Sequence, residues 1–142
     1  MLQVNSKSIK PAFDYRFKYG AGVWGQEVIP YDGVSSGVRW LGANAQMKVW
    51  VEKNVHARFG LKLAAAGQPR RVQLIFNGVR FDQQQVTHVL WNGGFDLVAW
   101  DISLKPGDNT LIVESDLPPQ TLPDGGRQVS FLLIDEAVLL NP

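Results

Sequence analysis

The sequence places large aromatic side chains close to carboxylate, amide and guanidinium groups, first between residues 24 and 50 and again near residue 91. Such rings stack on the apolar C–H faces of sugars, while the polar groups hydrogen-bond the sugar hydroxyls. We predict that Trp24, Tyr31 and Trp50 are exposed. The predicted ligand-binding residues are Trp24, Glu27, Tyr31, Asp32, Arg39, Trp50, Trp91 and Asn92.

Trp50 can be assigned to one face of a strand from its neighbours alone. Residues 45–52 alternate between apolar and polar side chains, which is the period of a β-strand. Trp50 therefore falls on the face opposite Met47, Val49 and Val51. If the methionine and valines lie in the core, Trp50 is exposed, and an exposed large aromatic side chain indicates a binding surface.

Trp91 lies at the end of a predicted strand, just before Asn92-Gly93-Gly94. Loops at the ends of strands often carry binding residues, which favours a role for Trp91 and Asn92 in binding. The alternative for any of these rings is that it fills the hydrophobic core. We expect that alternative to hold for Trp40 and Trp100.

The charged residues allow two kinds of site besides sugar binding. Arg39 and Glu27 could form a bidentate ion pair that fixes two early strands, and we predict that pair. A catalytic carboxylate pair for glycoside hydrolysis would need Glu27 together with Asp32 or Asp101. The spacing does not favour such a pair, so we do not expect an enzyme.

The histidines give no sign of a metal centre. His56 and His88 are far apart in the sequence, and there is no cysteine to complete a zinc site. We expect both side chains at the surface, and we expect no cofactor from this pattern.

Length and charge narrow the class of protein. The 142 residues are 45% hydrophobic and 19% charged, with a net charge of +1. We predict a single domain over residues 1–142, with its core within 20–140 and residues 1–19 as an extension or first strand. The balanced charge argues against nucleic acid as a partner, and no apolar run is long enough for a membrane helix. The sequence is as consistent with a piece of a longer protein as with a complete chain.

Turn signals divide the rest of the chain into short strands. Asn77-Gly78 between two β-prone runs is a strong hairpin signal, because both residues adopt positive φ readily. Residues 58–63 have helical propensity, yet they alternate like a strand, and we predict a strand. The proline- and glycine-rich stretch 116–126 is predicted to be a long irregular loop. About eight antiparallel strands forming one β-sandwich account for this pattern, with strands expected near 45–52, 58–63, 71–77, 79–82, 86–91, 95–104, 109–116 and 128–140.

Three segments resemble a galactose-binding-like jelly roll, the fold of many carbohydrate-binding modules. These are "VQLIFNGVRF" (72–81), "DLVAWDISLKPGDNTLIVES" (96–115) and "VSFLLIDEAVLL" (129–140). A shorter likeness involves Glu27 followed by Arg39-Trp40. It resembles the opening of β-sandwich domains attached to bacterial cell-envelope glycosyltransferases and polysaccharide-biosynthesis proteins, but the insert 29–37 departs from that pattern.

The resemblance implies a non-catalytic module that binds a glycan or polysaccharide. It implies a place in, or accessory to, a cell-envelope polysaccharide system, extracytoplasmic or envelope-associated, in a larger parent enzyme or a homo-oligomer. It also implies a structural Ca²⁺ held by Glu27 and Asp135, on first and last strands that would lie side by side. Two alternatives stay open: an assembly domain of a phage or appendage particle, and a small enzyme acting on polysaccharide.

Overall fold

The computed structural model describes residues 13–31 and 34–142, and these residues form strands joined by turns and loops. Nine strands have five or more residues: β1 (Tyr15–Tyr19), β2 (Glu27–Tyr31), β3 (Val34–Leu41), β4 (Asn44–Val51), β5 (Val55–Ala65), β6 (Arg70–Phe76), β9 (Asp96–Leu104), β10 (Gly107–Ser115) and β13 (Phe131–Leu140). Four are shorter: β7 (Val79–Arg80), β8 (Gln84–Val86), β11 (Gln120–Thr121) and β12 (Gln128–Val129). No helix capable of crossing a membrane occurs in the described part of the chain.

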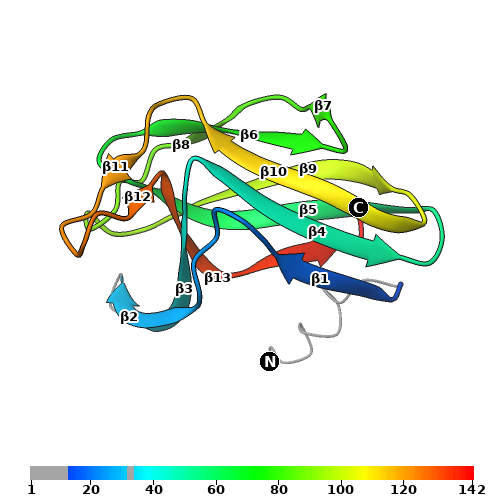
Figure 1. The fold of residues 1–142 in the computed structure, drawn as a ribbon, viewed down its shortest axis with the longest axis horizontal. Coiled ribbons are helices and arrows are strands. Elements are labelled where there is room, and N and C mark those ends of the chain that lie inside the picture. Colours follow the sequence, from blue (N-terminus) through cyan, green and yellow to red (C-terminus); the bar gives the residue numbers. More distant parts are fainter. Residues whose placement is uncertain (1–12, 32–33) are drawn as a thin grey trace.

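The strands form two sheets packed face to face (Figure 1). Sheet A has the order β1-β4-β10-β6-β7, with β8 also paired to β6, and sheet B has the order β2-β3-β13-β5-β9. The pairings between these strands are antiparallel. A separate two-stranded ribbon, β11–β12, lies at one end of the sandwich. The predicted antiparallel β-sandwich of about eight strands is confirmed.

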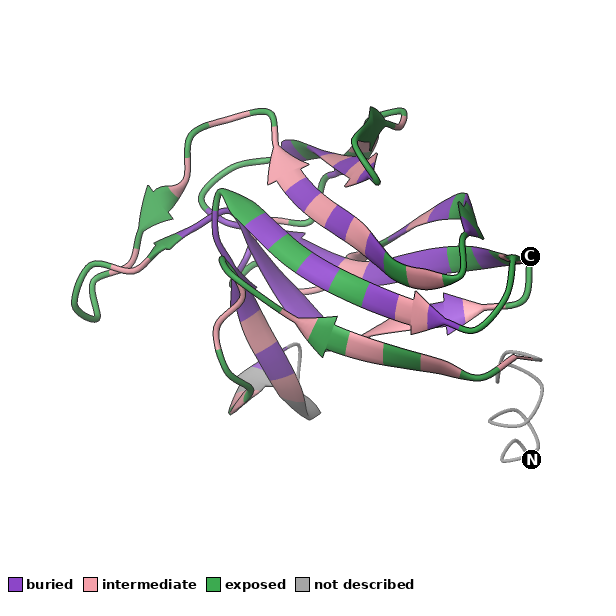
Figure 2. Cartoon of the chain, turned by 45° about the vertical axis from the view of Figure 1, so that its right-hand side comes forward, coloured by how far each residue is buried: buried purple, intermediate pink, exposed green. Residues whose placement is uncertain are grey.

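The main core lies between the sheets and follows the predicted period of two. Along β4, buried and more exposed residues alternate, which Figure 2 shows as bands of colour. The predicted strand at 58–63 is confirmed, because β5 pairs with both β13 and β9. The residues predicted for the core are all buried: Met47, Val49, Val51, Phe59, Leu61, Leu63, Val72, Leu74, Phe76, Leu111, Val113, Phe131 and Leu133.

A second, smaller hydrophobic cluster lies on the other face of sheet B. Leu61 and Leu63 of β5 point into the main core, whereas their neighbour Ala64 belongs to the second cluster. Trp40 is buried in this second cluster and Trp100 in the main core, so the prediction that both are core residues is confirmed. The end of sheet B is therefore covered on both sides, because Leu90 from the loop after β8 and Val129 from β12 pack into the second cluster.

The turn signals were correct at one hairpin and wrong at the next strand. Asn77 and Gly78 have φ of 47° and 84° and connect β6 to β7. The predicted strand at 86–91 is instead mostly loop, because β8 ends at Val86. The Ala65 N–H donates to His88 O, and the Leu90 N–H donates to Ala65 O. These two bonds form an isolated bridge between Val89 and Ala65 of sheet B.

Candidate functional site

The predicted binding residues do not form one surface. Tyr31, Trp91 and Asn92 come together at the end of sheet B, and Trp24 and Glu27 meet Arg127 nearby. The remaining residues lie elsewhere: Arg39 faces Tyr19 and Trp50 lies on the outside of sheet A, while Asp32 falls outside the described residues.

Trp91 is the exposed aromatic ring of this group, with 63% of its surface accessible. It sits in the segment 87–95, which we call the Trp91 loop. Its φ of 76° is unusual for a bulky side chain and costs on the order of 1–3 kcal/mol. Backbone hydrogen bonds of the residues on either side of Trp91 maintain this conformation. The Leu90 N–H donates to Ala65 O (2.7 Å), and the Asn92 N–H donates to Val89 O (3.0 Å).

Tyr31 contacts both the Trp91 ring and the backbone of the Trp91 loop. The prediction that Tyr31 is exposed is wrong, since its residue is only 5% accessible. Its hydroxyl donates to Gly94 O at 2.8 Å, and its ring meets the Trp91 ring edge to face, with centroids 6.0 Å apart. The ring fills the second cluster, so burial of apolar area outweighs the cost of covering a hydroxyl that has an acceptor. Tyr31 therefore fixes the loop, and of these two rings it is Trp91 that is exposed to solvent.

Asp96, at the start of β9, closes the other end of the Trp91 loop. Its carboxylate accepts hydrogen bonds from the Thr87 N–H (3.0 Å) and the His88 N–H (3.2 Å), and it contacts His88 Nδ1. Burial by itself raises the pKa of Asp96, but the hydrogen bonds from His88 and Thr87 together hold this pKa below the ordinary aspartate value. Both histidines are exposed, as predicted. The sequence analysis missed Asp96, because its hydrogen-bond donors lie eight and nine residues earlier in the chain, beyond the range of a local turn motif.

We expect the Trp91 loop to loosen in acid. Because the folded pKa of Asp96 lies below the unfolded value of about 3.9, its stabilising contribution is present above that pH and lost as the pH falls through the folded pKa. The difference in free energy of unfolding between the wild type and Asp96→Asn should therefore shrink below about pH 4. Urea unfolding at several pH values measures it. Asp82→Asn, at an exposed aspartate, is the control, and an Asp96→Asn difference independent of pH would contradict the assignment.

Glu27 has a different partner from the predicted one. Arg127 Nη1 lies 2.7 Å from Glu27 Oε2, and the guanidinium carbon lies 6.0 Å from the Trp24 ring and 5.9 Å from the Trp40 ring. The predicted Glu27–Arg39 pair is wrong. Arg127 was missed because it is 100 residues away and reaches Glu27 only through the β11–β12 ribbon. Trp24 is half-buried against the second cluster, so the prediction that Trp24 is exposed is also wrong.

Arg39 belongs to a structural contact between the two sheets. Its guanidinium stacks on the Tyr19 ring at 4.1 Å and its Nε lies 3.4 Å from a carboxylate oxygen of Glu136. Burial raises the pKa of Tyr19 to about 12, although its hydroxyl accepts a hydrogen bond from the Ala137 N–H. Each group is satisfied within this contact, which explains why Arg39 is not directed toward a ligand.

Trp50 faces outward from sheet A, as its alternation predicted, but it is half-buried. The guanidinium of Arg16, opposite Trp50 in the β1–β4 register, lies 4.1 Å above its ring. One face of this indole is thus covered by a cation, and Trp50 is a poorer stacking platform than Trp91.

The strands that would carry calcium are not neighbours. β3 lies between β2, which carries Glu27, and β13, so the prediction that the first and last strands are adjacent is wrong. Glu27 contacts Arg127, and Asp135 lies 3.1 Å from Lys62 Nζ. Residues 13–31 and 34–142 contain no group of three His, Cys, Asp or Glu side chains suited to a metal. Calcium binding stays a prediction.

The geometry also excludes Glu27 and Asp101 as a catalytic pair, because the two residues lie too far apart. Glu27 lies on β2 and Asp101 on β9, at opposite edges of sheet B. Four strand spacings of about 4.8 Å put their backbones about 19 Å apart, beyond the separation of roughly 5–9.5 Å that glycosidases use. Asp101 is instead paired with Arg58 at 2.9 Å.

Comparisons by sequence find no matching family model and no matching curated protein. Solved structures do match. They include the Podospora anserina GH26-CBM35 β-(1,4)-mannanase, with 17% identity and a TM-score of 0.56 over 90% of this chain and 27% of that one. A family 35 carbohydrate-binding module from an environmental isolate matches with 13% identity and a TM-score of 0.55, over 89% of this chain and 93% of the module.

A third match, the CBM35 from Paenibacillus barcinonensis, has 14% identity and a TM-score of 0.52, over 89% of this chain and 99% of that one. The chain thus spans about a quarter of the mannanase and nearly all of the two isolated modules. Identities this low are informative about architecture, and the architecture agrees with the two antiparallel sheets described above. The chain has the galactose-binding-like jelly-roll fold that these carbohydrate-binding modules share.

Proposed function

We propose that this protein is a non-catalytic glycan-binding module whose main contact is the ring of Trp91. The observation that carries the proposal is an indole 63% exposed to solvent on a loop whose conformation is fixed from several sides. The names of the structurally similar modules support the same class of function. An exposed ring of this size is otherwise a cost in water, which favours a partner that covers it.

The fixed loop is what makes Trp91 suited to sugar binding. Tyr31 and Asp96 hold the backbone before any ligand arrives, so little conformational entropy is lost on binding. Asn92 follows Trp91 in the chain and His88 lies in the same loop, and both are exposed, so their polar groups can hydrogen-bond hydroxyls at the edge of a stacked sugar. Because the surface is shallow, we expect dissociation constants from roughly micromolar to millimolar.

The wider setting is part of the proposal. The likeness of Glu27 and Arg39-Trp40 to domains of envelope glycosyltransferases supports a role in, or accessory to, a cell-envelope polysaccharide system, in an extracytoplasmic location. The mannanase match supports a module carried by a larger enzyme. Structural calcium, through Glu27 or Asp135, belongs to the same proposal and is tested together with binding.

Replacing Trp91 by alanine should weaken glycan binding by at least about tenfold, because stacking by one ring is worth about 1.4 kcal/mol or more. The measurement is a glycan array with and without calcium, followed by titration calorimetry on the best ligand. Trp50→Ala, on the other sheet, is the matched control and should bind within about twofold of the wild type.

Three results would contradict the proposal. Equal loss of binding in Trp50→Ala and Trp91→Ala would remove the Trp91 loop as the site. An array with no ligand, together with monodisperse oligomers in light scattering, would favour an assembly domain, and turnover of a bound polysaccharide would favour an enzyme.

A further inference from the structure

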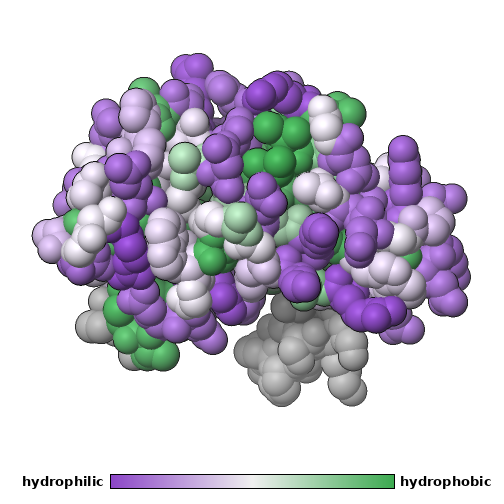
Figure 3. Space-filling model, viewed as in Figure 1, coloured by the Kyte–Doolittle hydropathy of each residue, from purple (hydrophilic) through white to green (hydrophobic). Residues whose placement is uncertain are grey.

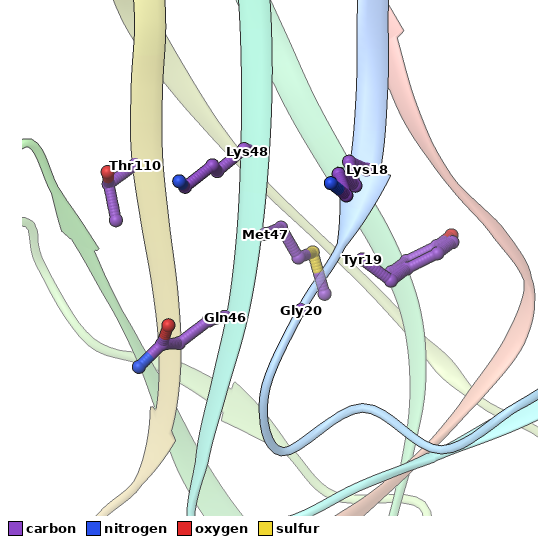
Figure 4. Close-up of a pocket in the computed structure, with 7 residues that line it drawn as sticks. All are labelled: Lys18, Tyr19, Gly20, Gln46, Met47, Lys48 and Thr110. Carbon is purple, nitrogen blue, oxygen red and sulfur yellow. The ribbon is translucent and has the colours of Figure 1, made fainter.

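A hollow of about 260 Å³ lies on the outer face of sheet A, away from the Trp91 loop. In Figure 4, Lys18, Lys48 and Thr110 form one row across β1, β4 and β10, and the Gln46 side chain in the next row extends toward β10. Tyr19, Gly20 and Met47 complete the lining. Figure 3 views this face, where hydrophilic side chains dominate around a smaller apolar area.

Two lysines line this hollow, Lys18 on β1 and Lys48 on β4, and in Figure 4 the Lys48 side chain extends toward Thr110. Lys18 and Lys48 are directly paired in the β1–β4 register, and both are exposed on the outward face. Neither ammonium group has an ion-pair or hydrogen-bond partner within residues 13–31 and 34–142. Like charges directly opposite one another destabilise a sheet, so the pair is a cost to the protein without an anion between them.

Protection of a sheet edge does not account for both lysines. β1 is the edge strand of sheet A, and a charged side chain such as Lys18 commonly prevents an edge from pairing with another chain. Lys48, however, lies on β4, which has neighbours on both sides. The second lysine therefore has no function in guarding the edge.

A glycine lines one end of the hollow. Gly20 follows β1 directly, and its N–H donates to Gln46 O at 2.8 Å, so the backbone stays close while residue 20 contributes no side chain. A Cβ placed at Gly20 would meet Gln46 O at 3.4 Å and Gln46 Cβ at 3.6 Å, which are ordinary contacts. The glycine is thus not required by crowding, and it leaves the hollow open.

The nearby carboxylates do not pair with the two lysines, so the positive charge of the hollow is uncompensated. On β10, Asp108 lies in the adjacent row, opposite Trp50, and Glu114 is paired with Arg80 at 3.2 Å. The Gln46 amide and the Thr110 hydroxyl add neutral hydrogen-bond donors to the same hollow.

We propose that this hollow is a second binding site, which takes an anionic substituent of an acidic polysaccharide. Lys18 and Lys48 would share the anion, and Gln46 and Thr110 would donate hydrogen bonds to it. A lysine ammonium is a point charge without the planar preference of arginine, so carboxylate and sulfate groups are both suitable. That the anion belongs to a polysaccharide rests on the proposed function, whereas the site itself is independent of Trp91.

The test uses three polymers at low ionic strength: polygalacturonate, dextran sulfate and unmodified dextran. We expect binding to at least one anionic polymer, weakened by added salt. Lys48→Gln should weaken that binding by about fivefold or more, since it removes one of the two lysine charges that would contact the anion. Lys53→Gln makes the same change in net charge at an exposed residue after β4, and it should stay within about twofold of the wild type.

Two further variants distinguish binding in this hollow from binding elsewhere on the protein. Gly20→Glu places a carboxylate in the hollow and should remove binding of the anionic polymer. Trp91→Ala should leave that binding within about twofold. Lys48→Gln should unfold in urea at the same or a higher concentration than the wild type, because it removes a like-charge contact. Loss of binding would then not be due to loss of the fold.

Four outcomes would overturn the proposal. Equal effects of Lys48→Gln and Lys53→Gln would indicate attraction by net charge alone. Loss of binding in Trp91→Ala would indicate a single site in the Trp91 loop. Tighter binding of single-stranded DNA than of either polymer would indicate another class of partner. Failure of both anionic polymers, with neutral glycans still bound on the array, would remove this site and leave the proposed function intact.

Discussion

Arg70→Met is expected to lower the free energy of unfolding by about 3–4 kcal/mol, a large part of the stability of a domain this size. Arg70 is 2% exposed, and its Nε donates to Ala66 O at 2.8 Å. Its Nη1 donates to Ser115 Oγ (3.1 Å), Leu117 O (3.1 Å) and Pro118 O (3.0 Å). Methionine fills much of the same volume but leaves the buried Ala66 carbonyl and the three partly buried acceptors without this donor, and unsatisfied buried groups are costly.

The neighbouring arginine provides a matched control. Arg71 is exposed, and its hydrogen bond to the Asp116 carboxylate comes from the backbone N–H, not from the guanidinium. Arg71→Met should therefore change stability by less than about 0.5 kcal/mol. Arg70→Lys keeps a charge but cannot reach acceptors in the same fork, and it should fall between the two. Urea unfolding followed by tryptophan fluorescence measures all three. Similar midpoints for Arg70→Met and Arg71→Met would contradict the assigned role.

The contacts of Arg70 also bear on the functional end of the molecule. They fix Leu117 and Pro118, just before the β11–β12 ribbon. That ribbon is followed by Arg127 next to Glu27 and carries Val129 into the second cluster. A buried guanidinium in sheet A thus holds in place part of the cover of sheet B. The stretch 116–126, predicted to be an irregular loop, is in this way tied down along its first half.

Local patterns in the sequence predicted the strands well, and the partners of side chains poorly. The alternation of Met47, Val49 and Val51 locates both the core face of β4 and the outward position of Trp50. Period two is a property of one strand, so it can be read without knowing the rest of the fold. The Asn77-Gly78 hairpin is likewise determined by two residues that tolerate positive φ.

The candidate site depended on contacts that no local pattern contains. Tyr31 is buried because a second cluster forms outside sheet B, and that cluster exists only when distant segments meet. Glu27 pairs with Arg127 for the same reason. Trp91 and Asn92 could be proposed as candidate binding residues because the adjacent Gly93-Gly94 identifies a turn from local sequence alone. Lys18 and Lys48 meet only through strand register, which is why the hollow in sheet A had no counterpart in the sequence analysis.

Asn109 lies near the start of β10, within the segment 96–115 that resembles the jelly roll, and the structure shows what its side chain does. It is fully buried, and its Nδ2 donates to Lys105 O (2.9 Å), Val49 O (3.2 Å) and Gly107 O (3.2 Å). Its Oδ1 accepts from the Lys105 N–H and from Asn77 Nδ2, both at 3.0 Å. One amide thereby joins the turn between β9 and β10 to β4 and to the β6–β7 hairpin.

Asn109→Ala should therefore lower the free energy of unfolding by about 2–4 kcal/mol, because several buried backbone groups lose their partner at once. Asn54→Ala is the control, at an exposed asparagine in the turn between β4 and β5, and should cost less than about 0.5 kcal/mol. Urea unfolding at pH 7 measures both. Equal midpoints for the two variants would show that the turn forms without the Asn109 amide.

Asn109→Asp is the sharper form of the same prediction, because it changes one amide nitrogen to oxygen with almost no change in shape. The new oxygen would face three carbonyl oxygens, and burial would raise the pKa of the introduced carboxyl above its unfolded value of about 3.9. The deficit relative to the wild type should then be small near pH 4 and grow as the pH rises, because ionisation of the introduced aspartate destabilises the fold, whereas ionisation of the native Asp96 stabilises it. A deficit that stays constant between pH 4 and 7 would mean that the amide fills space in the turn without donating to those carbonyls.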